Sequence, residues 1–150
     1  MMKRDGSTLD LFRDVQPAPV VPRFAAEDVK AWSRARRLSK AIAKTLADDG
    51  RSREVIAEAM SELLEEAVSK PMLDNYAAQE KEHQISALRL AALVMVTGDA
   101  RALNALLEEG GLIVVEAKYE ALLRREKARE LRERAEREEQ AADAEWRARR

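Results

Sequence analysis

The chain has 150 residues, enough for one domain of ordinary size with additional terminal segments. Apolar residues make up 46% of it and aromatic residues only 4%, so the expected core is small and aliphatic. Charged residues make up 37% with a net charge of −1, so any contact with nucleic acid must come from local patches rather than overall charge. With no cysteine in the chain, disulfides, thiol catalysis and cysteine-based zinc sites are excluded.

The N-terminal segment, residues 1–24, is predicted to be an extended, flexible arm. It holds Pro17, Pro19 and Pro22 and shows no lasting helical periodicity. No apolar stretch typical of a signal peptide opens the chain. The longest apolar run, Ala91–Val96, is too short to span a bilayer. We therefore expect a cytoplasmic protein without membrane contact.

The arm contains the segment Ser7-Thr8-Leu9-Asp10-Leu11-Phe12. It resembles the peptide by which many bacterial proteins dock on the replicative sliding clamp, usually Gln-Leu-Ser/Asp-Leu-Phe. Thr8 stands where glutamine is usual. This resemblance implies Leu9, Leu11 and Phe12 as partner-binding residues; alternatively, Leu11 and Phe12 pack on the protein's own core.

Residues 25–115 are predicted to form a helical domain. Apolar periodicity and capping residues place five helices there, at about 27–47, 53–64, 69–79, 87–96 and 100–109. The side chains expected to face inward are Trp32, Ala35, Leu38, Ile42 and Leu46 on the first helix, Val55, Ile56, Ala59, Met60 and Leu63 on the second, Met72, Leu73 and Tyr76 on the third, Leu90, Leu93, Val94 and Met95 on the fourth, and Leu103, Leu106 and Leu107 on the fifth.

A stripe of basic residues is predicted on the first helix. Six basic residues and no acidic one lie between positions 30 and 44. Lys30, Arg34, Arg37 and Lys44 recur at helical spacing, and Arg36 and Lys40 widen the stripe. Such a stripe can track a phosphate backbone; the alternative is a solvated face that offsets an acidic neighbour.

Residues 52–76 match the pattern of a helix-turn-helix unit, with Ala57 where the two helices would cross. The second helix would offer Lys70, Asn75 and Gln79 to base edges in the major groove. The alternative is a plain helical hairpin, because residues 51–82 contain four basic and eight acidic residues and phosphate contacts supply most of the affinity for DNA.

The C-terminal segment, residues 116–150, is predicted to be one long helix stabilised by charge pairs. It holds eleven basic and ten acidic residues and lacks proline and glycine. Its apolar positions approximate a thin heptad seam with alanine at most places. The preceding residues, 112–115, are either a short extended segment or the buried start of this helix. The predicted fold is therefore all-α: a compact bundle with a helix-turn-helix-like unit, an extended arm and a long charged helix.

Nothing in the sequence predicts catalysis. There is no glycine-rich phosphate loop, nucleophile elbow or ligand cluster, and the single histidine, His83, lies in a polar turn typical of a solvated or capping residue. We expect no enzymatic activity, no cofactor, no metal and no small-molecule substrate.

Residues 51–115 resemble a phage regulatory protein of the CII type. The motifs that carry the resemblance are Ile56-Ala57, Met60-Ser61, Val68-Ser69, Met72-Leu73 and, above all, His83-Gln84-Ile85-Ser86 through Thr97-Gly98-Asp99-Ala100-Arg101 into Gly110-Gly111-Leu112. The whole chain more closely resembles small proteins encoded in early regions of Mu-like prophages of proteobacteria, including the arm from Thr8 to Phe24.

This resemblance implies a λ-repressor-like DNA-binding domain that serves phage transcription control or DNA transposition, with residues 69–79 as its recognition helix. The acidic second helix and the longer turn depart from a typical repressor. The sequence thus favours a DNA-binding regulatory protein that acts on double-stranded DNA as a homodimer. The alternative is an interaction adaptor without DNA contact, in which the helical core links a clamp-docking arm to a partner of the C-terminal helix.

Overall fold

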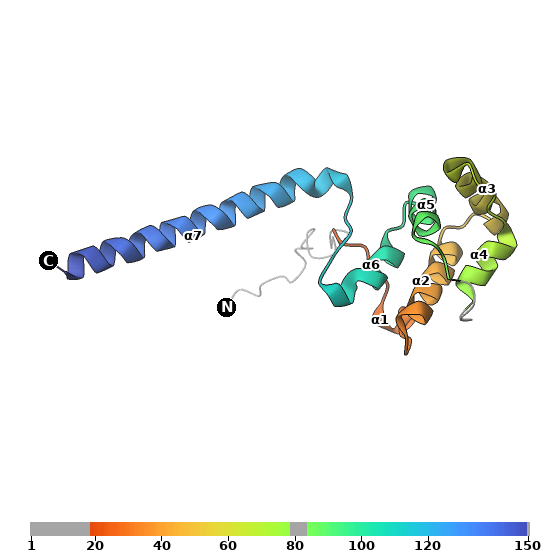
Figure 1. The fold of residues 1–150 in the computed structure, drawn as a ribbon, viewed down its shortest axis with the longest axis horizontal. Coiled ribbons are helices and arrows are strands. Elements are labelled where there is room, and N and C mark those ends of the chain that lie inside the picture. Colours follow the sequence, from red (N-terminus) through yellow and green to blue (C-terminus); the bar gives the residue numbers. More distant parts are fainter. Residues whose placement is uncertain (1–18, 79–83, 150) are drawn as a thin grey trace, which may run out of the picture. The chain divides into compact units, whose positions relative to one another are not determined.

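The computed structural model describes residues 19–78 and 84–149, which form helices and contain no strand (Figure 1). The all-α class predicted from the sequence is therefore confirmed. The chain divides into two compact units, residues 1–114 and residues 115–150. We call the described part of the first unit the helical core.

The helical core contains six α-helices and a final 3-10 turn. Their bounds are α1 Ala26–Val29, α2 Arg34–Asp48, α3 Arg53–Leu64, α4 Lys70–Ala77, α5 Ala87–Thr97, α6 Arg101–Leu107 and η1 Glu108–Gly110. Serine side chains start three of them: the hydroxyls of Ser33, Ser52 and Ser86 each accept the backbone N–H three residues on. Gly98 ends α5 at a φ of 67°, a left-handed conformation that suits glycine.

The single first helix predicted for residues 27–47 is wrong in one respect, because residues 30–33 interrupt it. Ser33 is extended, at φ −138°, and caps α2 through its hydroxyl. This interruption places Trp32 outside the helix, where its side chain is 77% exposed instead of buried. Ala35 is also exposed, whereas Ile42 and Leu46 are buried as predicted.

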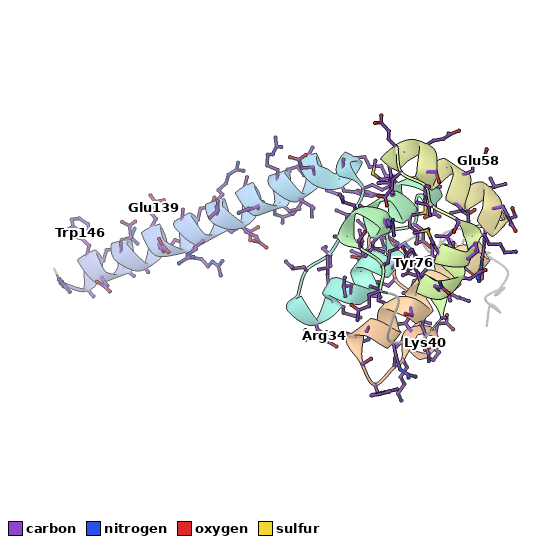
Figure 2. All side chains as sticks on the ribbon, turned by 45° about the vertical axis from the view of Figure 1, so that its right-hand side comes forward. Arg34, Lys40, Glu58, Tyr76, Glu139 and Trp146 are labelled. Atoms are coloured by element: carbon purple, nitrogen blue, oxygen red, sulfur yellow. The ribbon has the colours of Figure 1, made fainter. Side chains whose placement is uncertain are left out.

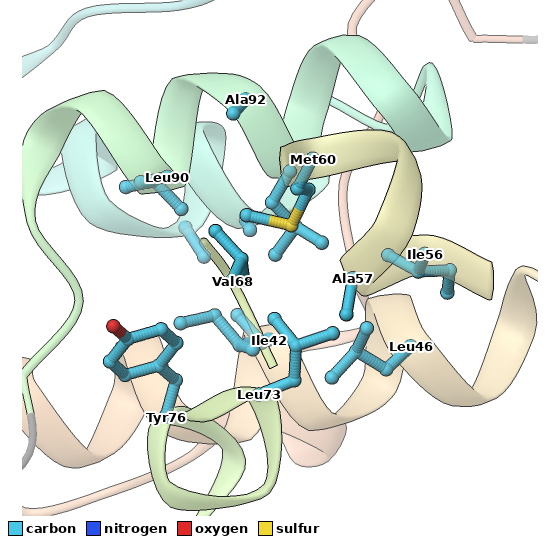
Figure 3. Packing of buried hydrophobic residues seen from close by; sticks show 14 of the residues in the cluster. Ile42, Leu46, Ile56, Ala57, Met60, Val68, Leu73, Tyr76, Leu90 and Ala92 are labelled. Carbon is cyan, nitrogen blue, oxygen red and sulfur yellow. The ribbon is translucent and has the colours of Figure 1, made fainter. Parts of the chain in front are cut away.

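The core lies where α2 packs against α4 and α6 and where α3 packs against α5. Figure 3 shows side chains of α2, α3, α4 and α5 converging around Met60, Val68 and Leu73. Small residues occupy many of the helix contacts, because they let two helices approach closely. The buried alanines are Ala41, Ala57, Ala92, Ala102 and Ala105.

Several large residues predicted to be buried are exposed. On α3, Val55 and Leu63 face solvent while Ile56, Ala57 and Met60 are buried. On α5, Leu90 and Leu93 are buried as predicted, but Met95 is 69% exposed. The physical reason is the same on both helices. The stripe of apolar side chains along each helix is wider than the face that packs against neighbouring helices, and the small Ala57 and Ala92 lie within that packed face.

On α6 the prediction also placed the wrong side chains inside. Ala102, Asn104 and Ala105 are buried, whereas Leu106 is 37% exposed and Leu103 and Leu107 are only half-buried. The helix turns this face inward because Asn104 binds three backbone groups. Its amide donates to the carbonyls of Pro22 at 2.9 Å and Val114 at 3.0 Å, and its oxygen accepts the N–H of Val114 at 2.6 Å.

Asn104 thus ties two irregular segments to α6. One is residues 19–24, the described end of the predicted arm, where the guanidinium of Arg101 also lies 4.2 Å from the centre of the Phe24 ring. The other is residues 112–114. Residues 112–116 belong to no helix, and Leu112 and Ile113 are exposed, so the alternative in which 112–115 form the buried start of the last helix is wrong.

The second unit consists of a 3-10 turn, η2 (Ala117–Tyr119), and one long helix, α7 (Glu120–Ala148). None of the residues of α7 is buried. Ion pairs four residues apart recur along it, including Arg129 with Glu133 at 3.0 Å and Arg134 with Glu138 at 3.1 Å. Such pairs stabilise a helix without help from tertiary packing. The long charged C-terminal helix predicted from the sequence is confirmed.

Candidate nucleic-acid interface

The basic stripe of α2 is partly neutralised by another element. Glu109 of η1 binds Arg34 and Arg37, both at 2.8 Å. The hydrogen bond and charge of Arg34, and then the charge of Arg37, hold the pKa of the Glu109 carboxyl below its ordinary value. Lys44 lies 3.7 Å from Asp48 and 3.8 Å from Asp28. Three of the four cations predicted to contact phosphate therefore have carboxylates beside them.

Three cations near the start of α2 have no such partner among the residues that the structure describes. Among the described residues of the helical core, only Lys30, Arg36 and Lys40 have no carboxylate oxygen within 4.0 Å of their charged groups. They are adjacent: the Lys40 ammonium donates to the Lys30 carbonyl at 2.6 Å, and the Arg36 guanidinium lies 4.7 Å from the centre of the Trp32 ring. We call Lys30, Trp32, Arg36 and Lys40 the Trp32 cluster.

The Trp32 cluster presents chemistry suited to a phosphate chain. Arg36 and Lys40 are four residues apart and so share a helix face. The Lys40 ammonium donates one hydrogen bond to the Lys30 carbonyl and retains two further protons to donate. Figure 2 labels Lys40 on α2 and Glu58 on α3, two different helices of the core.

The predicted recognition helix corresponds to α4, which ends at Ala77, so Gln79 lies outside the described residues. Asn75 is exposed and available to a ligand. Lys70 is not free: its ammonium lies 2.8 Å from Glu54, whose hydrogen bond and charge raise the pKa of Lys70. Arg53 forms an ion pair with Asp74 across the same two helices.

The connection between α3 and α4 is held in one conformation. Glu65 adopts a left-handed backbone with φ 53°, and the Ser61 hydroxyl accepts the N–H of Val68 at 2.8 Å. The same hydroxyl oxygen lies 2.8 Å from the carbonyl oxygen of Ala57. This hairpin is compatible with both predicted alternatives, a DNA-reading unit and a plain structural pair, because both require the same packing of α3 on α4.

A second polar cluster joins the ends of α2, α5 and α6. Arg101 binds Asp99 at 2.8 Å and Asp48 at 2.9 Å, and the Thr45 hydroxyl donates to Asp99 at 3.3 Å. Burial of Asp99 opposes its ionisation, but the hydrogen bonds and charge of Arg101 outweigh this effect and lower its pKa. Every charge here is compensated, so the cluster serves to hold three helix ends together.

In the part of the chain that the structure describes, no group of three or more histidines, aspartates and glutamates could hold a metal ion. No helix among those same residues has the length and apolar composition needed to cross a membrane. The segment proposed to dock on a sliding clamp, with Leu9, Leu11 and Phe12, and also His83 lie outside the described residues.

Sequence reasoning named six cations in residues 30–44 but treated Trp32 as a core residue, and so missed the cluster around it. Ser33 could have indicated that Trp32 lies outside the helix, because a serine can cap the start of a helix and the residue before the cap is then not helical. In the comparisons with known proteins, no family model matched the chain, and neither did any curated protein or solved structure.

Proposed function

We propose that this protein is a phage-type regulatory protein that binds double-stranded DNA through its helical core, in transcription control or DNA transposition. The observation that carries the proposal is the Trp32 cluster. Its three cations have no carboxylate partner in the described core, whereas each other described cation of the core has one. Unneutralised cations are the groups that release counterions from DNA on binding, which supplies most non-specific affinity.

In this proposal the two parts of the predicted interface have different roles. Lys30, Arg36 and Lys40 bind phosphates and set general affinity, without reading sequence. Asn75 on α4 is exposed, and an asparagine side chain can bind adenine through two hydrogen bonds. Lys70 contributes only after it exchanges Glu54 for a phosphate, so its contribution to affinity is smaller than its charge indicates.

The test measures binding to a generic duplex by fluorescence anisotropy over a range of salt concentrations. The variant Arg36→Gln with Lys40→Gln removes two cations of the Trp32 cluster. The matched control, Arg34→Gln with Arg37→Gln, removes two cations of the same helix that already bind Glu109. The first variant should flatten the salt slope by about one unit per lost contact. The control should change the slope by less than half as much.

Two results would overturn the proposal. Wild-type protein without salt-dependent binding at low ionic strength would exclude DNA binding by this surface. Equal slopes for the two variants would show that overall charge, rather than the Trp32 cluster, determines the affinity. In the first case the adaptor function, with a clamp-docking arm and a helical tail, becomes the leading candidate, because α7 leaves Leu123 and Leu131 exposed for a protein partner.

For sequence preference, Asn75→Ala should narrow the affinity difference between a selected site and random duplex while leaving the salt slope unchanged. If Asn75→Ala leaves a measured preference unchanged, α4 does not read bases through this residue.

A further inference from the structure

The solvent-facing side of α5 carries only apolar side chains. Between its caps Ser86 and Gly98, the exposed residues are Ala87, Leu88, Ala91 and Met95. Leu88 is 74% exposed and Met95 is 69% exposed. A helix on the surface of a monomer ordinarily turns polar residues to solvent, and a contiguous apolar patch marks an interaction site. This face therefore requires an occupant.

The patch extends from α5 onto α3. The residues that line a groove between the two helices are Ala59, Glu62, Leu63, Met95 and Val96. Leu63 is 44% exposed there, although a leucine at this position was predicted to be buried. The groove begins at the Met95 end of α5, so a side chain from a partner that lies along α5 would enter it at that end.

We propose that a second copy of this chain covers the patch, with the two α5 helices packed antiparallel about a two-fold axis near Ala91. Leu88, Ala91 and Met95 follow one another at spacings of three and four and so share one face. Along this face a large, a small and a large side chain follow in order. A two-fold axis near the small residue therefore places each large side chain of one copy opposite a large side chain of the other. Leu88 of each copy then meets Met95 of the other and reaches the groove, while the paired Ala91 residues let the helices approach.

The charges beside the groove favour this occupant and this direction. Among the described residues, no cation lies within 4.0 Å of the Glu62 carboxylate, and Glu62 is exposed. An antiparallel second copy brings the N-terminus of its own α5 to Glu62, and the free amides of a helix N-terminus attract negative charge. A parallel copy would instead bring the two Glu62 carboxylates to the same end, where they repel. The inference does not depend on DNA binding.

The first experiment measures the mass of the full chain in solution by light scattering and sedimentation. Wild type should have twice the monomer mass of 16.9 kDa. Leu88→Glu and Met95→Glu should each raise the dissociation constant at least about tenfold, because each buries a carboxylate in the apolar contact. Helicity should be unchanged, because both side chains are exposed in the single chain. Leu131→Glu on α7, also exposed, is the matched control.

Two outcomes of this experiment would overturn the inference. One is a wild-type protein that stays monomeric at every concentration tested. The other is a dimer that Leu131→Glu dissociates and Met95→Glu does not, which would assign the contact to α7.

Disulfide trapping tests the direction of the contact, and the chain has no natural cysteine to interfere. Ala91→Cys should form a linked dimer under mild oxidation, because a disulfide requires Cα atoms within roughly 7 Å. Ala47→Cys, at an exposed alanine of α2, should not. A mixture of Leu88→Cys and Met95→Cys chains should link, while Leu88→Cys alone should stay reduced. Linkage of Leu88→Cys to itself would show a parallel contact and overturn the proposed arrangement.

Discussion

Charged side chains in the helical core and in α7 find their partners over very different distances along the chain. In the core, Arg34 and Glu109 are 75 residues apart and Arg101 and Asp48 are 53 apart. In α7, Arg129 and Arg134 bind carboxylates only four residues away. These long-range ion pairs of the core therefore form only after the helices have packed, whereas the pairs four residues apart in α7 need nothing but the helix itself.

This difference shows what stabilises each unit. Exposed ion pairs contribute about 1 kcal/mol or less wherever they occur, so the pairs of the core cannot be its main support. The core is stabilised instead by its buried apolar side chains, which α7 lacks. Changes inside the core should therefore have large effects, and changes in α7 small ones. The predictions below test this contrast.

The largest effect is expected for Leu93→Ala. Leu93 is fully buried on α5, and its truncation leaves a cavity. The free energy of unfolding should fall by about 2–5 kcal/mol, as measured by urea denaturation. Leu112→Ala removes the same atoms from an exposed position and should change it by less than about 0.5 kcal/mol. Similar losses for the two variants would contradict the placement of α5 in the core.

A smaller but distinct loss is expected for Asn104→Ala. The substitution leaves the N–H of Val114 and the carbonyls of Pro22 and Val114 without the Asn104 side chain. An unsatisfied buried polar group costs about 1–3 kcal/mol, so the free energy of unfolding should fall by that amount. Hydrogen exchange at the Val114 amide should accelerate more than in the core helices. Asn75→Ala, at an exposed asparagine, is the control and should be neutral.

The contrast between the two units also explains which parts of the structure could be predicted from the sequence. Helix starts depend on local hydrogen bonds, so Ser52 and Ser86 indicated α3 and α5 correctly. α7 was equally predictable, because its ion pairs are local. The orientation of each helix was harder, since it depends on neighbours that are distant in sequence. Val55, Leu63 and Met95 match the helical period but lie outside the buried face.

For the candidate site, the sequence identified the cations but not their partners. No pattern within residues 30–44 shows that Glu109 binds Arg34 and Arg37, because that contact requires α6 to pack on α2. Asn104 illustrates the same limit. A polar residue in a leucine-rich helix is expected to face solvent. Asn104 is instead buried, because its side chain forms hydrogen bonds with two irregular segments.

A pH-dependent effect is expected at Asp99, whose folded-state pKa is lowered. A carboxylate of this kind stabilises the folded state fully above its unfolded pKa, and that contribution is lost as the pH falls through the lower, folded value. Asp99→Asn should therefore lower the free energy of unfolding by about 1 kcal/mol at pH 7. The difference in free energy of unfolding between Asp99→Asn and wild type should shrink once the pH falls below 3.8, the ordinary pKa of an aspartate side chain. Glu58→Gln, at an exposed residue with no cation partner among the described residues, should show no such convergence. A difference for Asp99→Asn that persists at low pH would contradict the role of its charge.

The smallest effect is expected for removal of the chain after Tyr119. Every described residue of α7 is exposed, so the deletion removes no buried side chain from the helical core. The midpoint of thermal unfolding should stay constant, and the free energy of unfolding should change by less than about 0.5 kcal/mol. A synthetic peptide of residues 120–149 should be partly helical alone and lose helicity in high salt, because its pairs are exposed and screened. A large loss of stability on truncation, with a peptide that is not helical, would show that α7 depends on the core and would remove the contrast between the two units.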